Sequence, residues 1–271
     1  MSLVFTAIAP HGGLAIDAIC EPEEVGVARS TQEGMAELGR RFDRARPEAT
    51  VVLTPHNVHV EGSFAVVLAA TSVGDLGNGV ALEVPGDIDL AATFLDELRI
   101  AGIPTAAVSF GGNDPGAAAM PMDWGTLIPL WFMGGRSDSP VPVVIVSPSR
   151  DRPLEEHVRA GDVLRRVIDR AAKRVAVIAS ADHGHAHDAE GPYGFDPAAA
   201  EYDERIVELV RGGRLDCLPE LGTLAEPAKA DSLWQLLILD GVLAPGARAE
   251  LLSYEAPTYF GMLCASFEPG A

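Results

Sequence analysis

Three apolar segments of the sequence run almost directly into histidines. His11 follows LVFTAIAP, His56 and His59 follow TVVLTP, and His183, His185 and His187 crowd together shortly after VAVIAS. Imidazole is the commonest metal ligand in proteins and the side chain best suited to proton transfer near neutral pH. If the three segments are neighbouring strands, their histidines converge on one site that could bind a metal ion and move protons.

A metal site of this kind also needs a carboxylate. Two histidines and one carboxylate, with open coordination positions, form the facial triad typical of non-haem Fe(II) proteins that react with O₂. The sequence holds 39 acidic residues, so composition alone does not select the third ligand. The remaining histidine, His157, lies in the charged stretch LEEHVRA and is predicted to be a solvated surface residue.

The elements that must position these histidines alternate along the chain. Apolar segments rich in β-branched residues predict strands, and segments with apolar residues at helical spacing predict helices between them. The predicted strands cover residues 3–9, 50–54, 64–70, 105–110, 143–147, 175–180 and 260–267, and the predicted helices cover 30–45, 87–102, 154–174, 197–213 and 230–241. We therefore expect a single α/β domain over residues 1–271, with a central, mostly parallel or mixed sheet flanked by helices. In such sheets, sites lie beyond the carboxyl ends of the strands.

Composition excludes several classes of function. The net charge of −19 disfavours binding to nucleic acid and to anionic membranes, and no apolar run is long enough to span a membrane. Cys20, Cys217 and Cys264 are far apart and in no metal-binding spacing, so we expect free thiols in a reducing compartment. The first residues show no signal-peptide pattern. We expect a cytoplasmic protein.

Five segments together resemble a known family. APHGG, TPHNVHVEGSFAV, SADHGHAHDAEGPYGF, ADSLWQLLILDG and YEAPTYFGMLCASF, in this order, resemble the class III extradiol ring-cleavage dioxygenases, in particular catalytic chains of the protocatechuate 4,5-dioxygenase type. The similarity runs from Ile8 to Phe267. It implies an enzyme of aromatic catabolism that opens a catechol-type diol with O₂ at Fe(II), with Zn or Mn as alternative metals.

The resemblance also implies roles for individual residues. His11 and His56 match the family's two metal-binding histidines. Ser180, Asp182 and His185 fit the Ser-x-Asp-x-x-His spacing around its catalytic histidine, with His183 and His187 as alternatives.

Two positions depart from the family pattern. The family's third ligand is a carboxylate, and the simplest ungapped match puts Ser232 there; the adjacent Asp231 is our preferred ligand, and Glu226 is the next candidate. Trp124 stands where many relatives have a histidine that contacts the substrate.

We assign Trp124 and His59 to substrate binding. Arg150, after a predicted strand, is the candidate to bind a carboxylate of the substrate. Relatives often pair as dimers or with a small second chain, so a homodimer or a second subunit is the expected partner.

Two other functions stay open. A hydrolase-like enzyme with Zn or Mn could use the same scaffold, and a second metal could be bound by His183 or His187 with Asp182 or Asp188. Alternatively, Ser232 in place of a ligand, with Trp124, would suit a non-catalytic subunit that keeps the fold.

Overall fold

The backbone is organised around one large mixed sheet. A computed structural model describes residues 2–244 and 246–268. The eight-stranded sheet has the order β10-β11-β1-β9-β2-β8-β3-β6. Its strands are β1 (Leu3–Ala9), β2 (Ala49–Leu53), β3 (Phe64–Val67), β6 (Thr105–Val108), β8 (Val143–Ser147), β9 (Val175–Ser180), β10 (Ala249–Glu255) and β11 (Met262–Phe267).

Four parallel strands form the centre of this sheet. β1, β9, β2 and β8 are parallel neighbours, whereas β11 and β3 pair antiparallel with β1 and β8 at the two sides. The central strands are almost continuously buried, because helices or a second sheet cover both faces. β9 lies between β1 and β2; Ala9 pairs with Ser180 and Leu53 with Ala179. The three strands therefore end level with one another, at the same edge.

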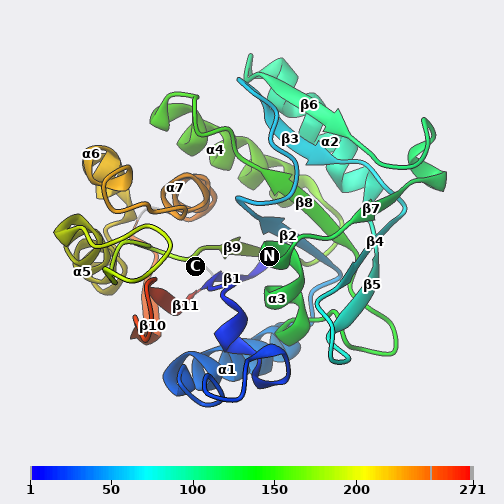
Figure 1. The fold of residues 1–271 in the computed structure, drawn as a ribbon. Helices are drawn as coiled ribbons and strands as arrows, with labels where there is room; N and C mark the ends of the chain where they lie inside the picture. The colour runs from blue at the N-terminus through cyan, green and yellow to red at the C-terminus, as the bar shows by residue number, and fades with distance from the viewer. Residues whose placement is uncertain (1, 245, 269–271) are drawn as a thin grey trace.

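Two layers cover the sheet (Figure 1). On one face pack α2 (Ile88–Ile100), α4 (Leu154–Arg170), α5 (Pro197–Gly212) and α7 (Leu233–Val242), whose apolar side chains join those of the strands in the larger core. On the other face lie α1 (Arg29–Ala45), α3 (Trp124–Phe132) and a three-stranded sheet of order β5-β4-β7. These last strands are β4 (Thr71–Asp75), β5 (Ala81–Pro85) and β7 (Ala119–Pro121), and the short α6 (Gly222–Ala225) precedes α7.

Close packing against α4 positions the C-terminal half of α7. A Cβ on Gly161 of α4 would lie 2.0 Å from the Ile238 carbonyl oxygen, and one on Gly241 of α7 would lie 2.1 Å from that of Val158. Two glycines thus let the backbones of the helices touch. Nearer the start of α7, Gln235 Nε2 donates to the Ser180 oxygen at 3.1 Å, which places the first turn beside the end of β9, at the carboxyl edge of the sheet.

The predicted α/β class, with a mixed central sheet in a single domain, is confirmed. The predicted strands and helices are present, although the strands expected over 64–70 and 105–110 end at Val67 and Val108. We did not predict β4, β5, β7 or β10. β4 and β5 are short, and only every second residue in them is buried. Their sequences therefore contain no continuous apolar run. None of the helices in the described part of the chain is long and apolar enough to cross a membrane.

The prediction for His157 was wrong. His157 is fully buried in α4, and its ring packs against Phe64, with the centroids 4.9 Å apart. Its Nδ1 lies 3.1 Å from the Pro153 oxygen and its Nε2 3.1 Å from that of Ser149. Burial lowers the pKa of His157. Charged neighbours in sequence point to other sides of the helix, which is why they misled the prediction.

Candidate metal centre and active-site cavity

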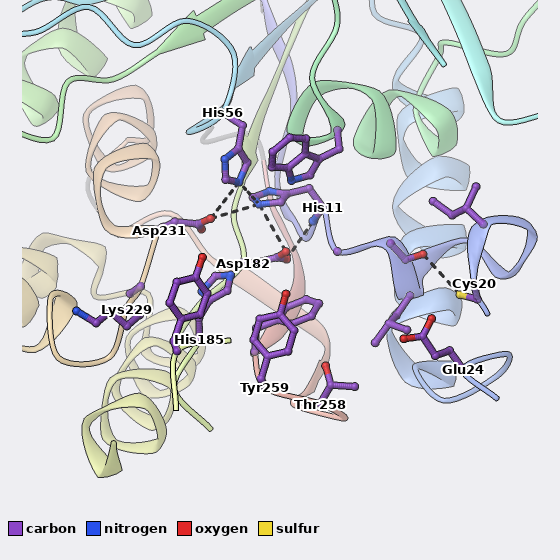
Figure 2. A pocket seen from close by; sticks show the side chains of 18 of the residues that line it. His11, Cys20, Glu24, His56, Asp182, His185, Lys229, Asp231, Thr258 and Tyr259 are labelled. Carbon is purple, nitrogen blue, oxygen red and sulfur yellow. Dashed lines mark hydrogen bonds and ion pairs between the residues drawn. The ribbon is translucent and has the colours of Figure 1, made fainter. Parts of the chain in front are cut away.

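Loops that leave adjacent parallel strands bring the predicted histidines together. His11 follows β1, Asp182 follows β9 and His56 follows β2. Adjacent strands lie about 4.8 Å apart. The ends of two strands that flank a third are therefore close enough for imidazoles that face one another to meet. Figure 2 shows His11 and His56 directed toward one another, with Asp231 beside them and Asp182 below.

Three side chains present ligand atoms to one point. The Nε2 atoms of His11 and His56 are 3.0 Å apart, and Oδ2 of Asp231 lies 3.4 Å and 3.2 Å from them, respectively. Two atoms each about 2.1 Å from one ion lie about 3.0 Å apart at a right angle and about 3.4 Å apart at the tetrahedral angle. The spacing therefore fits a divalent ion. Among the described residues, His11, His56 and Asp231 form the one such group.

The turn after α6 places Asp231. Lys229 adopts a left-handed conformation (φ 54°), and the Ala230 N–H donates to the Ala225 oxygen while the Lys229 N–H donates to that of Glu226. This is the pattern of a Schellman helix end, which reverses the chain and directs Asp231 toward the histidines. Oδ1 of Asp231 is buried and has no hydrogen-bond partner among the described residues. A buried, unpartnered carboxylate oxygen beside two imidazoles suits a cation.

The other two candidates for the third ligand lie elsewhere. The side chain of Glu226 is 88% exposed and forms an ion pair with Lys229 at 2.7 Å. Ser232 Oγ is within hydrogen-bond distance of His183 Nδ1, at 3.0 Å, and of the Tyr202 hydroxyl, at 2.9 Å. The structure thus brings Asp231, and neither alternative, to the two histidines.

Hydrogen bonds around His11 select the nitrogen that faces the site. The Ser180 hydroxyl donates to the Gly125 oxygen, so toward His11 Nδ1, 2.9 Å away, it can only accept. Neutral His11 therefore carries its proton on Nδ1, so Nε2 is the nitrogen that can exchange its proton for a metal. Such an outer partner orients a ligating imidazole and fixes its tautomer. Asp182 adds a second restraint, because its Oδ1 accepts the backbone N–H of His11 at 3.0 Å.

Electrostatics at the site favour a positive charge. Burial alone would lower the pKa of His11, but the carboxylates of Asp182 and Asp231 outweigh it and raise the pKa to about 9. Burial would likewise raise the pKa of Asp231, yet the imidazoles of His11 and His56 hold it well below its usual range. Burial, together with the charge of Asp231, raises the pKa of Asp182. Two buried carboxylates thus stabilise a proton on His11, and a divalent cation could replace that proton.

Of the three clustered histidines, only His185 lines the cavity next to this group. Its Nδ1 donates to the His183 oxygen at 2.7 Å, which leaves Nε2 free to accept a proton. Its ring stacks on Phe260, with centroids 5.5 Å apart and planes 15° apart. His183 is fully buried behind the loop, where burial lowers its pKa, and it does not line the cavity.

Asp203 in α5 holds the loop that carries His185. It is 1% exposed and accepts hydrogen bonds from the backbone N–H of Gly184, from His187 Nε2 and from the Tyr254 hydroxyl, at 2.7, 2.8 and 2.8 Å. His187 therefore has a structural partner instead of facing the cavity. Sequence reasoning missed Asp203, because an acidic residue in an amphipathic helix resembles any solvated one.

The cavity has a volume of about 710 Å³ and an aromatic wall. Trp124, the first residue of α3, is 49% exposed, and its ring centroid lies 4.4 Å from that of His56. Tyr193, Tyr259 and Phe260 line the wall near His185. His59, which we assigned to substrate binding, is exposed and is not among the residues that line the cavity.

Comparisons with known proteins concern the chain as a whole. A curated relative, Protein CA_C1420 of Clostridium acetobutylicum, is 19% identical over 261 residues, which are 94% of this chain and 55% of that protein. The chain thus spans about half the length of this relative. The crystal structure of an uncharacterized protein, JW3007 from Escherichia coli K12, superposes with a TM-score of 0.63 at 18% identity, covering 97% of this chain and 99% of that one, which shows a shared fold.

A family model covers nearly all of the chain. The family described as the catalytic LigB subunit of aromatic ring-opening dioxygenase matches residues 6–262, and this match confirms the resemblance predicted from the sequence motifs. The chain belongs to the family of the catalytic LigB subunits of aromatic ring-opening dioxygenases.

Proposed function

We propose that the protein is an extradiol dioxygenase, which opens the ring of a catechol-type diol with O₂ at a bound Fe(II) ion. The observation that carries this proposal is the meeting of three ligand atoms, from His11, His56 and Asp231, beside His185 in one cavity. Two imidazoles and one carboxylate form the ligand set of non-haem Fe(II) oxygenases. Family membership supports a dioxygenase-type enzyme, while the diol and the metal are our proposal.

His11, His56 and Asp231 would hold the ion. When bound, Fe(II) would supply Lewis acidity toward the diol and a path for electrons from the diol to O₂. Zn or Mn would fit the same atoms, because the spacing does not separate octahedral from tetrahedral coordination. A ferrous ion and free cysteines both suit a reducing cytoplasm, which we keep as the proposed location.

His185 would move the proton. With its Nδ1–H donated to the His183 oxygen, Nε2 can accept a proton from a hydroxyl of the diol and later return it to the opened product. The stack on Phe260 and the backbone hydrogen bond from the His185 N–H to the Ala228 oxygen hold the ring in place. Burying a neutral imidazole in this apolar wall costs less free energy than burying a further carboxylate.

The aromatic wall suits a planar substrate. Trp124 already contacts His56 on one side, and a diol ring bound at the metal would lie near its exposed portion. Aromatic rings pack favourably in offset or edge-to-face geometry, each pair contributing about 0.5–1.5 kcal/mol beyond burial. The cavity of about 710 Å³ has room for a single-ring substrate. A homodimer or a small second subunit stays a proposal.

A two-metal hydrolase has less support. Its additional ligands were expected from His183 or His187 with Asp182 or Asp188. His187 is hydrogen-bonded to Asp203, and His183 is hydrogen-bonded to Ser232. Asp188 is exposed. These residues do not assemble a second metal-binding group within the described part of the chain.

The proposal is tested by loading the protein with Fe(II) under anaerobic conditions and offering a panel of catechols with O₂. We expect O₂ uptake and yellow ring-opened products, and we expect His11→Ala to lose the bound metal. Asp188→Ala, which changes an exposed acidic residue, is the matched control and should keep metal and activity. If no diol is cleaved, and His11→Ala leaves the metal content unchanged, the proposal fails.

A further inference from the structure

The hydrogen bond that fixes the tautomer of His185 comes from a single peptide group. His185 Nδ1 donates to the His183 oxygen at 2.7 Å, and that oxygen belongs to the peptide between His183 and Gly184. The N–H of the same peptide, on Gly184, donates to Oδ1 of Asp203 at 2.7 Å. Because a trans peptide is planar, its N–H and C=O point in opposite directions. Asp203 and the His185 ring are therefore bound to the two ends of one rigid unit.

Asp203 is itself fixed in direction. Its Oδ2 accepts hydrogen bonds from His187 Nε2 and from the Tyr254 hydroxyl, both at 2.8 Å, which leaves Oδ1 for Gly184. Burial, together with the charge of Asp203, raises the pKa of Tyr254, so its hydroxyl stays a donor. A buried carboxylate bound by three donors has little freedom to turn. His187, which the proposed mechanism does not use, thus orients Asp203.

The His183 side of the peptide is anchored as well. His183 Nδ1 lies 3.0 Å from Ser232 Oγ, which in turn lies 2.9 Å from the Tyr202 hydroxyl, and all three side chains are fully buried. Ser232 directly follows the proposed ligand Asp231. Tyr202 directly precedes Asp203 in α5. Two consecutive residues of one helix therefore hold the peptide, one through a chain of side chains and one directly.

Close packing on α5 brings the peptide within reach of Asp203. A Cβ on Gly184 would lie 2.9 Å from the Cα atom and from the carbonyl oxygen of Ala199, in α5. Any side chain at this position would therefore push the peptide away from the helix. A pair of backbone hydrogen bonds holds it from the other side, because the His183 N–H donates to the Gly261 oxygen at 2.8 Å and the Gly261 N–H to the Gly184 oxygen at 3.0 Å.

We propose that Asp203 is the positioning residue of the proposed base, and that it acts through the peptide between His183 and Gly184 to keep the proton of His185 on Nδ1. This inference rests on the proposed function and deepens it. The charge of the carboxylate polarises the peptide, which makes the His183 oxygen a stronger acceptor for the Nδ1–H group. Nε2 then keeps a free lone pair, which is the state that a general base needs. Asp203 thus does through a peptide what the carboxylate of a catalytic triad does by bonding its histidine directly.

The tautomer of His185 can be measured without turnover. In metal-free protein labelled with ¹⁵N-histidine, long-range proton–nitrogen correlations distinguish the Nδ1–H from the Nε2–H form of a neutral imidazole, and His185→Asn identifies the signals of His185. Wild-type protein should show the Nδ1–H form alone. In Asp203→Ala the His183 oxygen is no longer oriented, so we expect a mixture of both tautomers. Asp203→Asn, whose amide oxygen can still accept the Gly184 N–H, should restore the Nδ1–H form.

Turnover supplies the second half of the test. In the Fe(II)-loaded protein, Asp203→Ala should lower kcat by about 10- to 100-fold, the cost typical of losing a group that orients a functional imidazole. KM should change little, because Asp203 does not line the cavity. Asp203→Asn should recover most of the lost kcat. Should Asp203→Ala not fold, His187→Ala takes its place with smaller shifts in the same direction, and His187→Gln, whose Nε2 can still donate to Asp203, should reverse them.

A matched control separates this role from the loss of any buried carboxylate. Asp87 is 8% exposed, accepts the Leu90 N–H at 3.1 Å and is bound to Lys173 at 2.6 Å, but it does not line the cavity. Asp87→Ala should lower the free energy of unfolding and leave both kcat and the His185 tautomer unchanged. If it shifts them as Asp203→Ala does, or if Asp203→Ala keeps the Nδ1–H form alone, the inference is overturned.

The two measurements also separate this inference from the proposed function. If the His185 tautomer depends on Asp203 although no diol is ever cleaved, the hold of Asp203 on His185 stands and the proposed function fails. If Asp203→Ala cleaves diols with the kcat of the wild-type protein, the function stands and the inference fails.

Discussion

Metal binding to the free protein has to displace a proton from His11. The pKa of His11 is raised to about 9, so at pH 7 only about 1% of the metal-free protein has this imidazole unprotonated. The apparent association constant at pH 7 should therefore be about 100-fold below its value above pH 9, and it should rise about tenfold per pH unit between them. At pH 7, close to one proton should be released from His11 per ion bound.

The cause of this shift can be altered without touching a proposed ligand. Asp182 is one of the two carboxylates that raise the pKa of His11. In Asp182→Asn the side-chain oxygen can still accept the backbone N–H of His11, as Oδ1 does at 3.0 Å, but the charge is gone. The pKa of His11 should fall toward its ordinary value of 6.5, so the pH dependence of metal binding should flatten between pH 7 and 9.

The assay is a titration of metal-free protein with Co(II) or Mn(II) against a competing chelator, from pH 6 to pH 9. Calorimetry in two buffers of different ionisation enthalpy counts the protons released. Asp188→Asn, at an exposed acidic residue, is the control and should behave as wild type. An association constant that does not change over this range, or an unchanged slope in Asp182→Asn, would refute the electrostatic reasoning.

The same proton affects the stability of the metal-free fold. Because the pKa of His11 in the folded protein exceeds the unfolded value of 6.5, protonation stabilises the fold fully below about pH 6.5. This contribution is lost as the pH rises through about 9. Urea unfolding of the metal-free protein should therefore show a lower free energy of unfolding at pH 9.5 than at pH 6.5, and Asp182→Asn should reduce the difference.

Three further predictions concern the ligand, the base and the loop. Asp231→Ala should lower metal affinity by at least about 100-fold, whereas Glu226→Ala should change it by less than about 3-fold, as elemental analysis after dialysis would show. His185→Ala should retain metal but lower kcat by about 10²- to 10⁴-fold in stopped-flow assays; full activity would exclude it as the base. Gly261→Ala would put a Cβ 1.9 Å from Oδ2 of Asp203, so it should lower the free energy of unfolding by about 1–3 kcal/mol, and an unchanged urea midpoint would contradict this.

The ends of strands were the part of the site that the sequence could predict. Apolar runs followed by histidine identify both the strand and the place where it stops, and parallel neighbours bring His11 and His56 to one edge. Their Nε2 atoms lie 3.0 Å apart, which is the spacing that a shared metal site requires. The order β1-β9-β2, which puts the His185 loop between them, depends on the sheet topology and not on any local pattern.

The third ligand depends on backbone geometry that the sequence does not reveal. A shift of one residue turns a helical side chain by about 100°, so Asp231 and Ser232 could not be separated by alignment. The left-handed conformation of Lys229 directs Asp231, and not Ser232, toward the two histidines. Because this residue is not a glycine, the sequence gives no sign of the turn. Asp203 could not be recognised from the sequence for a different reason, because its hydrogen-bond partners come from the His185 loop and from β10.

Anomalous diffraction from crystals of the Fe(II)-loaded protein tests the central claim most directly. Data collected on both sides of the iron absorption edge should show one strong peak, about 2.0–2.2 Å from His11 Nε2, His56 Nε2 and a carboxylate oxygen of Asp231. A peak bound by other residues, or iron-loaded crystals without a peak between these three side chains, would contradict the account.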